Sequence, residues 1–526
     1  MSSTERVVRS SVPVAIGTAL SRLTGMARLA AMAYALGFDR LADTYNLANT
    51  TPNIVYELLL GGVLSATLVP LFVDYRDKGD DEATSAVVSM VGLALILLTG
   101  IGILVAPAIV RLYTLRLSDA TAAAQQQVAT DLLRMFMPQM LFYGLTAIAT
   151  ALLNAHRRFA APAVTPVLNN LLVTAIFLAL PHLVDGPLTL DGIRNDPGTL
   201  WLLGLGTTAG IAAMALPLLP ALRRAGIRIR PVFRPRHPAV RTVVRLSGWT
   251  AGYVAVNQVA LWIILVLANG TTGGVSIYQG AYIFFQLPHG LVAVSLMTTL
   301  SPELAETAAR RDFTAFRRNL ALGLRLMTLV ILPASLGLAL LAKPVVSLLL
   351  ERGALTAGQA DVTAACVALL AVGLLPFSLY LYALRGFYAL QDTRTPFVLN
   401  CWENVANVAV AVALYPWFGV EGLALSFSVA YAGAAVMALR SLARRTDGLG
   451  LDLRSRQVLA RTAVAALVMT LAVWLAVVAL PGRPPAIVEV AAGVAVGVVV
   501  YIAALSAMRV REVAEIRRRL RAGRTE

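Results

Sequence analysis

Two arginines inside an otherwise apolar segment are the residues best suited to binding chemistry. Arg22 and Arg28 occur within the stretch "SRLTGMAR". Because a planar guanidinium binds two phosphate oxygens at once, two such cations suit a substrate that carries phosphate. Ionisable groups within a bilayer are costly, and they usually face a protein interior or a water-filled cavity. The pair therefore predicts part of a polar cavity inside a membrane protein.

A polar stripe follows in the next apolar segment, "DTYNLANTTPNIVYELLLGG". On a helix that turns by about 100° per residue, its two acids and three asparagines fall within about 120° of arc. Amides exchange hydrogen bonds with hydroxyls and other amides, so stripe and arginines together predict a cavity for a headgroup with phosphate and sugar. The alternative is that the arginines only form internal ion pairs with the acids. The stripe consists of Asp43, Asn46, Asn49, Asn53 and Glu57.

Two later segments carry further polar groups. Gln279 and Gln286 lie in an apolar run that an internal repeat, described below, relates to the run with the stripe. We expect their amides to face the same cavity. Glu403 and Asn407 are one helical turn apart, a spacing at which their oxygens could coordinate a cation. Hydrogen bonding between helices is the alternative explanation for this second pair.

The composition excludes an ordinary soluble protein. Of the 526 residues, 58% are hydrophobic and 14% are charged, so a soluble globule of this chain would have a largely apolar surface. A net charge of +16 would suggest nucleic-acid binding in a soluble protein. Here the arginines lie in short clusters between apolar runs, and no nucleic-acid module is recognisable. The charge pattern indicates membrane topology instead.

No sequence motif for catalysis is present. The chain lacks a Walker phosphate loop, an HExxH helix, a CxxC pair and a nucleophile elbow. No loop between the apolar runs is long enough to hold a nucleotide-binding domain. We therefore expect neither an enzyme nor an ATP-driven pump, and neither a cofactor nor a metal. Transport would draw on a gradient, with the membrane potential or a monovalent cation as candidates for coupling.

Apolar runs that are long enough to cross a bilayer as helix, about 20 residues each, recur along the whole chain. They predict an all-α integral membrane protein with about 14 transmembrane helices. The runs lie near 11–36, 43–74, 86–112, 128–155, 162–182, 199–221, 246–268, 275–301, 319–342, 361–389, 396–415, 421–441, 460–480 and 486–508.

The distribution of Lys and Arg tests this number of helices. If the N-terminus is cytoplasmic, the cytoplasmic side carries about 33 of the 44 Lys and Arg residues, and the other side carries about 7. Removing or adding one helix would destroy this asymmetry. We therefore expect both termini in the cytoplasm. Basic cytoplasmic loops such as 223–245 are expected to contact anionic lipid headgroups.

The chain also contains an internal repeat. Thr165 and Thr395 each precede a proline in two similar stretches and are 230 residues apart. An offset that spans six helices preserves orientation, so the two halves are parallel repeats. Parallel two-lobe repeats are a recognised plan of transporters, with the substrate site between the lobes. The predicted parts are an N-lobe (1–230), a C-lobe (231–450), and a final part with two more helices and a basic tail (451–526).

Several specific segments resemble the MurJ/MviN lipid II flippases of the multidrug/oligosaccharidyl-lipid/polysaccharide exporter superfamily. They are "SRLTGMARLAAMAYALG", "TYNLANTTPNIVYELLLGGVLSATLVPLF" and "LLLERGALTAGQADV" followed by "RGFYALQDTRTP". The resemblance implies fourteen helices in two lobes in the bacterial cytoplasmic membrane. It also implies transport of lipid II, the undecaprenyl-diphosphate-disaccharide-pentapeptide used in peptidoglycan synthesis, from the inner to the outer leaflet by alternating access.

The resemblance further implies roles for particular residues. In such proteins the headgroup enters a central cationic cavity, and the lipid tail rests in a groove beside the last two helices. By position, Arg22 and Arg28 match the two arginines of the family cavity, and Asp43 matches an acid at the start of the second helix. Ile283 stands where the family often has an arginine, and Leu29 where it commonly has an acid. The cavity is therefore expected to be less cationic than in the family pattern.

The residues leave two other functions open. The missing arginine at Ile283 would fit an exporter of another lipid-linked oligosaccharide or of a small molecule. A non-transporting scaffold that recruits cell-wall synthesis proteins through its basic cytoplasmic surface would tolerate the loss of Arg22 and Arg28. The expected partners are lipid II or a related undecaprenyl-diphosphate-linked saccharide, together with anionic lipids at the basic loops, but not nucleic acid.

Overall fold

The computed structural model describes residues 3–58, 68–117, 119–184, 186, 188–482 and 484–510, with side chains from residue 16 onward except at 119 and 244–250. Throughout these residues the regular structure is helical. Part of the segment that bears the polar stripe, 59–67, and most of the basic C-terminal tail, 511–526, lie outside the described residues.

Each of the fourteen predicted runs coincides with helix in the described part of the chain. There, ten helices are long and apolar enough to cross a membrane, and one bent pair of helices meets the same criterion together. The prediction of an all-α membrane protein is therefore confirmed. The side of the membrane on which each terminus lies remains a prediction.

The chain divides into two compact units, and the first contains residues 1–276 and 352–356. It includes α11 and the start of α12, which the sequence repeat assigns to the second lobe, so the predicted lobe boundaries remain predictions. The helices of this unit are α1 (Ser3–Leu36), α2 (Arg40–Tyr56), α3 (Val69–Lys78), α4 (Asp81–Tyr113), α5 (Asp119–Phe136), α6 (Gln139–Ala155), α7 (Ala160–Leu183), α8 (Leu190–Arg194), α9 (Pro197–Ala215), α10 (Leu218–Arg224) and α11 (Pro238–Ala268).

Within the first unit, α1 packs along α7. A Cβ atom at Gly17 would lie 2.7 Å from the backbone oxygen of Ala163, so the close approach of the two helices requires glycine there. Further along, the Asn170 side-chain amide donates hydrogen bonds to the Ser21 carbonyl (3.0 Å) and to the Thr24 hydroxyl (3.1 Å). These contacts hold the part of α1 that carries Arg22 and Arg28, the arginines of the predicted cavity.

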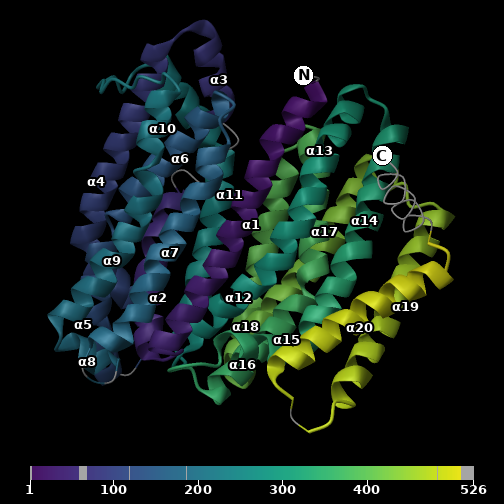
Figure 1. The fold of residues 1–526 in the computed structure, drawn as a ribbon. Helices are drawn as coiled ribbons and strands as arrows, with labels where there is room; N and C mark the ends of the chain where they lie inside the picture. Colours follow the sequence, from purple (N-terminus) through teal and green to yellow (C-terminus); the bar gives the residue numbers. More distant parts are fainter. Residues whose placement is uncertain are drawn as a thin grey trace. The chain divides into compact units, whose positions relative to one another are not determined.

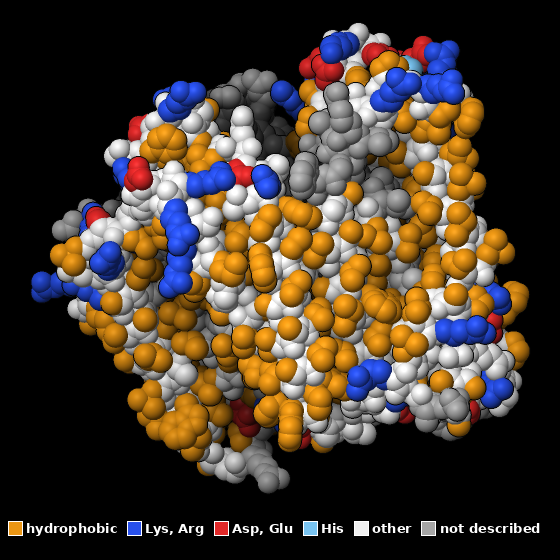
Figure 2. Space-filling model, turned by 180° about the vertical axis from the view of Figure 1, so that it is seen from behind, with side chains coloured by type: hydrophobic (Ala, Val, Ile, Leu, Met, Phe, Trp, Pro, Cys, Tyr) orange, Lys and Arg blue, Asp and Glu red, His pale blue; other side chains and the backbone are white. Residues whose placement is uncertain are grey.

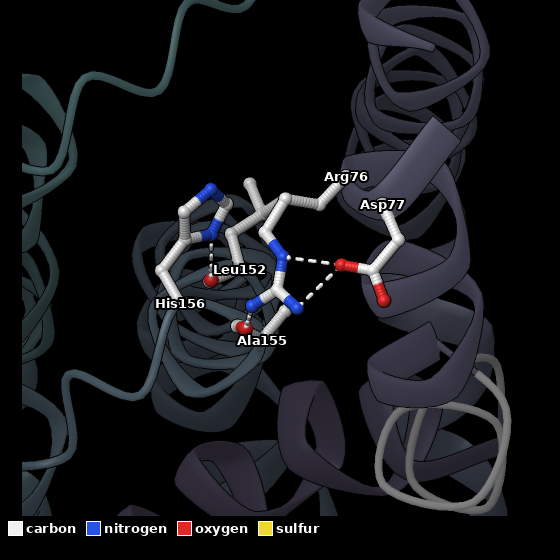
Figure 3. Close-up of polar contacts among 5 residues, drawn as sticks. All are labelled: Arg76, Asp77, Leu152, Ala155 and His156. Carbon is white, nitrogen blue, oxygen red and sulfur yellow. Dashed lines mark hydrogen bonds and ion pairs between the residues drawn. The ribbon is translucent and has the colours of Figure 1, made fainter. Parts of the chain in front are cut away.

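The end of α6 is closed by an arginine from α3 (Figure 3). Arg76 donates to the Ala155 carbonyl in the last turn of α6 and to the Asp77 carboxylate. In the same view the His156 ring lies over its own helix end, with Nδ1 2.9 Å from the Leu152 carbonyl. A cation is favourable at this position because the last carbonyls of a helix lack partners and carry partial negative charge.

The second unit contains residues 277–351 and 357–526. Here α19 and α20 lie side by side, and α19 also packs on α14 (Figure 1). The helices are α12 (Gly274–Pro288), which starts in the first unit, the π-helical turn η3 (His289–Ala293), α13 (Val294–Ala309), α14 (Phe313–Leu340), α15 (Ala342–Leu350), α16 (Ala357–Val372), α17 (Leu374–Ala389), α18 (Arg394–Arg445), α19 (Leu453–Val478) and α20 (Ala486–Ala507).

Proline and glycine explain where the second unit departs from straight spans. The continuous α18 is two predicted helices joined at a kink, where Gly419 has φ 54° and ψ −131°, and Pro416 precedes it. The predicted helix near 361–389 is instead the pair α16 and α17, bent by 42°. The bend lies at Gly373, just before Pro376, whose ring disfavours a continuous helix.

The surface fits a surrounding of lipid. Hydrophobic side chains cover the middle of the face drawn in Figure 2, and Lys and Arg gather mainly toward its edges. The side chains of Leu104 on α4 and Leu467 on α19 are 79% and 63% exposed. Outside a membrane such a surface would drive aggregation, whereas in hydrocarbon it is the expected solvent contact.

Candidate substrate cavity and lipid groove

The predicted site residues fall into two groups, one in each compact unit. Arg22, Arg28 and the polar stripe of α2 belong to the first unit, and the two glutamines of α12 belong to the second. Both arginines on α1 are half-buried. They are six residues apart, so they differ by about 120° around the helix and by about 9 Å along it.

Arg28 lies among tyrosines. Its guanidinium is close enough to the hydroxyls of Tyr45 on α2 and Tyr143 on α6 to interact electrostatically with both. The Tyr143 ring packs on Tyr56 of α2, with ring centroids 5.5 Å apart. Tyr45 in turn hydrogen-bonds to the Thr207 hydroxyl of α9 at 2.9 Å. Two neutral tyrosine hydroxyls therefore lie near the Arg28 guanidinium.

Asp43, at the start of the stripe, caps another helix. It is fully buried and accepts hydrogen bonds from the Gly273 N–H (2.7 Å), the Ser276 N–H (2.9 Å) and the Ser276 hydroxyl (2.9 Å). Asn46, one turn further along α2, donates to the same hydroxyl at 3.0 Å. A carboxylate is stabilised here because the first N–H groups of α12 lack partners within that helix.

Arg40 strengthens the same connection. Its guanidinium donates to the Asn269 carbonyl (2.7 Å) and to the Thr272 hydroxyl (2.8 Å). The Asn269 amide donates to the Tyr113 carbonyl, and its oxygen accepts from Gln125. Hydropathy and periodicity give no signal for these partners of Arg40, which come from other segments of the chain. Substrate binding by Asp43 and Asn46 remains a prediction.

The later part of the stripe is more open. Asn53 is exposed, and Glu57 is half-buried beside Tyr56. The Asn49 side-chain oxygen is buried and has no hydrogen-bond partner among the described residues. An exposed asparagine within a bilayer helix is costly on a lipid-facing surface, so this half of the stripe fits the predicted hydrated cavity.

In the second unit, the polar groups of α12 lie near an acid of α18. Gln279 and Gln286 are both half-buried and, being seven residues apart, share one face of the helix. Gln286 hydrogen-bonds to the Tyr282 hydroxyl. That hydroxyl and the hydroxyl of Tyr278 interact electrostatically with Glu403.

The kink at Gly419 divides α18 into two arms, a first arm before it and a second arm after it. Glu403 and Asn407 lie on the first arm. Glu403 is 2% exposed, and neither of its carboxyl oxygens has a hydrogen-bond partner among the described residues. The Asn407 oxygen accepts a hydrogen bond from Ser426 of the second arm at 2.9 Å. Among the described residues, no group of three or more His, Cys, Asp or Glu side chains could hold a metal ion. Glu403 is thus a buried carboxyl group available to a ligand, and Asn407 connects the arms.

An apolar groove runs between α14, α19 and α20. It has a volume of about 860 Å³. Gly493 and Gly497 form part of its wall, and a Cβ at Gly493 would lie 2.7 Å from the Leu341 side chain. Its other lining residues include Pro333, Leu338, Met469, Val473, Val498 and Ile502. The groove lies beside the last two helices, where the family resemblance places the lipid tail.

Comparison with known proteins identifies a family and relatives of this chain. The family model "Lipid II flippase MurJ" matches residues 32–483. The "Probable lipid II flippase MurJ" of Vibrio cholerae is 29% identical and covers 84% of this chain and 85% of its own length. The protein of the same description from Rhizobium tropici is 30% identical, with 84% and 81% covered.

Solved structures show the same fold. "Lipid II flippase MurJ, inward closed conformation" superposes with a TM-score of 0.76 at 20% identity, covering 94% of this chain and 99% of that chain. An inward-facing multidrug resistance MATE family transporter of the MOP superfamily superposes with a TM-score of 0.66 at 12% identity, with 82% and 98% covered.

Proposed function

This chain belongs to the lipid II flippase MurJ family, and we propose that it moves lipid II across the cytoplasmic membrane by alternating access, with Arg28 binding the diphosphate. The members of this family are transporters, so the chain is a multi-pass membrane transporter and not an enzyme.

The position of Arg28 among neutral hydroxyls is the observation that carries the proposal. Tyr45 and Tyr143 can orient the guanidinium, but they do not neutralise its charge. In a low-dielectric surrounding, such a cation attracts a diphosphate strongly and binds its oxygens bidentately. Asn53 and Glu57 then lie on the neighbouring helix as hydrogen-bonding groups for the sugars or the peptide. Arg22 completes the proposed set in the first unit, and substrate binding by Gln279 and Gln286, in the second unit, remains a prediction.

The groove between α14, α19 and α20 is the proposed site of the undecaprenyl tail. Apolar side chains line it, and its volume of about 860 Å³ suits a long hydrocarbon chain. A tail held there would remain in hydrocarbon while the headgroup crosses in the polar cavity, so neither part would enter an unfavourable medium.

Glu403 is the proposed coupling group. A buried carboxyl group without a hydrogen-bond partner in the described structure is costly, and binding a monovalent cation would compensate it. Asn407 adds an amide oxygen one turn away, and its bond to Ser426 would link occupancy to the packing of the two arms of α18. If the bound cation crosses part of the membrane, the membrane potential also contributes to the free energy of its binding.

Complementation of flippase-depleted cells tests the proposed function, with the exposure of lipid II on the outer leaflet assayed together with growth. We expect the wild-type chain to rescue both, and Arg28→Ala to abolish both at equal membrane insertion. Arg116→Ala, which removes an exposed arginine outside the cavity, is the matched control and should retain activity. Normal flipping by Arg28→Ala would refute the role of Arg28. Failure of the well-inserted wild type would refute lipid II as the cargo.

A further inference from the structure

A second cavity, apart from the proposed transport site, lies between the two arms of α18. It has a volume of about 610 Å³ and combines four arginines with an apolar wall. The first arm contributes its opening turn and the turns after it, and the second arm contributes its last turns. Its main lining residues are Arg394, Val398, Trp402, Met437, Arg440 and Arg444.

The positive charge of this cavity exceeds what its neighbouring acid can balance. Asp392 accepts hydrogen bonds from the N–H groups of Arg394 and Thr395, both at 3.0 Å, and so caps α18. The same carboxylate pairs with Arg445 at 2.7 Å. One acid, already engaged by a helix end and by one arginine, leaves Arg394, Arg440 and Arg444 available to an anion.

The placement of these arginines would be unfavourable without an anion. Arg394 is the first residue of α18, where the helix dipole disfavours a cation. Arg440 and Arg444 are one helical turn apart, so their like charges repel each other. All three side chains are exposed and line the cavity, Arg394 from the first arm and the other two from the second.

The apolar wall distinguishes a lipid from a small soluble anion. Val398, Trp402 and Met437 are 43%, 59% and 42% exposed, on the part of the cavity that continues along the arms away from the arginines. Trp402 lies eight residues after Arg394, which is about 12 Å along the helix. That spacing matches a phosphate at the interface and acyl chains below it, with an indole at the boundary.

We propose that this cavity binds an anionic glycerophospholipid, with its phosphate between Arg394, Arg440 and Arg444 and its acyl chains against Val398, Trp402 and Met437. By the arginine distribution, it faces the cytoplasmic leaflet. The lipid bridges the two arms of α18 at the end opposite the Gly419 kink. The proposal does not depend on lipid II transport, because none of these residues belongs to the proposed transport cavity or to the tail groove.

Fluorescence quenching of Trp402 tests the proposal in the full-length protein. The protein is placed in nanodiscs of phosphatidylcholine that contain either brominated phosphatidylglycerol or brominated phosphatidylcholine. Subtracting the signal of Trp402→Phe isolates this tryptophan from the other five. We expect preferential quenching by the anionic brominated lipid. In Arg440→Ala/Arg444→Ala we expect its apparent affinity to fall about tenfold or more, since each charge-assisted contact contributes about a factor of ten.

A matched variant separates a built site from general surface charge. Arg223→Ala/Arg224→Ala removes the same charge from exposed positions of α10 and should leave the quenching unchanged. An equal loss in this variant, or equal quenching by the two brominated lipids, would overturn the proposal. Circular dichroism of Arg440→Ala/Arg444→Ala establishes that it folds. Arg440→Lys/Arg444→Lys keeps the charge and should retain part of the preference for the anionic brominated lipid. This variant replaces the alanine variant in the test if the latter does not fold.

Competition identifies the source of the anion. Inorganic phosphate that displaced the brominated lipid at comparable concentration would overturn the assignment to a lipid, because the apolar wall would then contribute nothing. Undecaprenyl diphosphate that displaced it far better than unlabelled phosphatidylglycerol would also overturn it, in favour of the transported class of lipid. Displacement by phosphatidylglycerol alone supports the proposal.

Discussion

Replacing Asp43 by alanine should destabilise the protein through the start of α12. Three hydrogen bonds to a buried carboxylate are lost, from the Gly273 N–H, the Ser276 N–H and the Ser276 hydroxyl. Each buried donor left without a partner costs about 1–3 kcal/mol. The loss of an ordinary cap costs about 1 kcal/mol and at most about 2 kcal/mol. We expect the free energy of unfolding to fall by about 3 kcal/mol, because two backbone donors lose their acceptor together.

Asp39 provides the matched control. It is exposed, and its carboxylate accepts one local hydrogen bond, from the Arg40 N–H at the start of α2 (2.7 Å). Asp39→Ala should therefore cost about 0.5–1 kcal/mol. The loss of free energy of unfolding in Asp43→Asn should lie between those of the two alanine variants. The amide keeps one of the two oxygens that accept from Gly273 and Ser276, while its NH₂ group faces the donors of the other oxygen.

Unfolding by sodium dodecyl sulfate in mixed micelles, followed by circular dichroism, measures these free energies. A double-mutant cycle with Ser276→Ala isolates the bond to the serine hydroxyl, for which we expect a coupling energy of about 1 kcal/mol. An effect of Asp43→Ala no larger than that of Asp39→Ala would refute the capping role. A coupling energy of zero would refute only the bond from the Ser276 hydroxyl, because Ser276→Ala keeps both backbone donors.

Two further predictions address helix packing and the coupling group. Gly17→Ala should lower the free energy of unfolding by about 1–3 kcal/mol, because its Cβ would meet the Ala163 backbone at 2.7 Å. Gly92 is the control, since no atom lies within 4 Å of a Cβ added there. Gly92→Ala should leave the free energy of unfolding unchanged or raise it in the same assay. Sodium or lithium should raise the free energy of unfolding of the wild type, by about 2.7 kcal/mol when the ion concentration is about a hundred times its dissociation constant. The same ions should not stabilise Glu403→Gln. Glu489→Gln should keep the ion response, and an ion response retained by Glu403→Gln would contradict the coupling role.

Sequence periodicity and hydropathy were sufficient for the fold. Each predicted apolar run contains helix in the described part of the chain, because a bilayer requires backbone hydrogen bonds to be satisfied within each segment. The breaks were less predictable. The bend at Gly373 and the kink at Gly419 depend on local glycine and proline geometry, which a hydropathy window averages out.

The partners of the polar residues could not be predicted from the sequence. Asn170 and Asn400 each lie five residues after one of the two repeated threonines. Nevertheless, Asn170 donates to α1, whereas the Asn400 carbonyl accepts from Asn404 on its own helix. Periodicity identified the polar stripe on α2. It did not show that the first residues of the stripe are buried in helix capping while the later ones are exposed or half-buried. Asp43 caps α12 while Asn53 stays exposed, because the first turns of α2 lie against the segment before α12 and the later turns do not.

The surroundings of Arg28 favour an anionic ligand over the internal ion pair that the sequence left open. Asp43, the proposed counter-charge, is hydrogen-bonded to Gly273 and Ser276. Arg28 interacts electrostatically with Tyr45 and Tyr143 instead. The Tyr143 ring packs on Tyr56, beside which Glu57 lies. A diphosphate that reaches Arg28 therefore need not displace Asp43, whose three hydrogen bonds would cost several kcal/mol to break. The cap of α12 and the binding of an anion can then coexist, because they use different side chains: Asp43 for the cap and Arg28 for the anion.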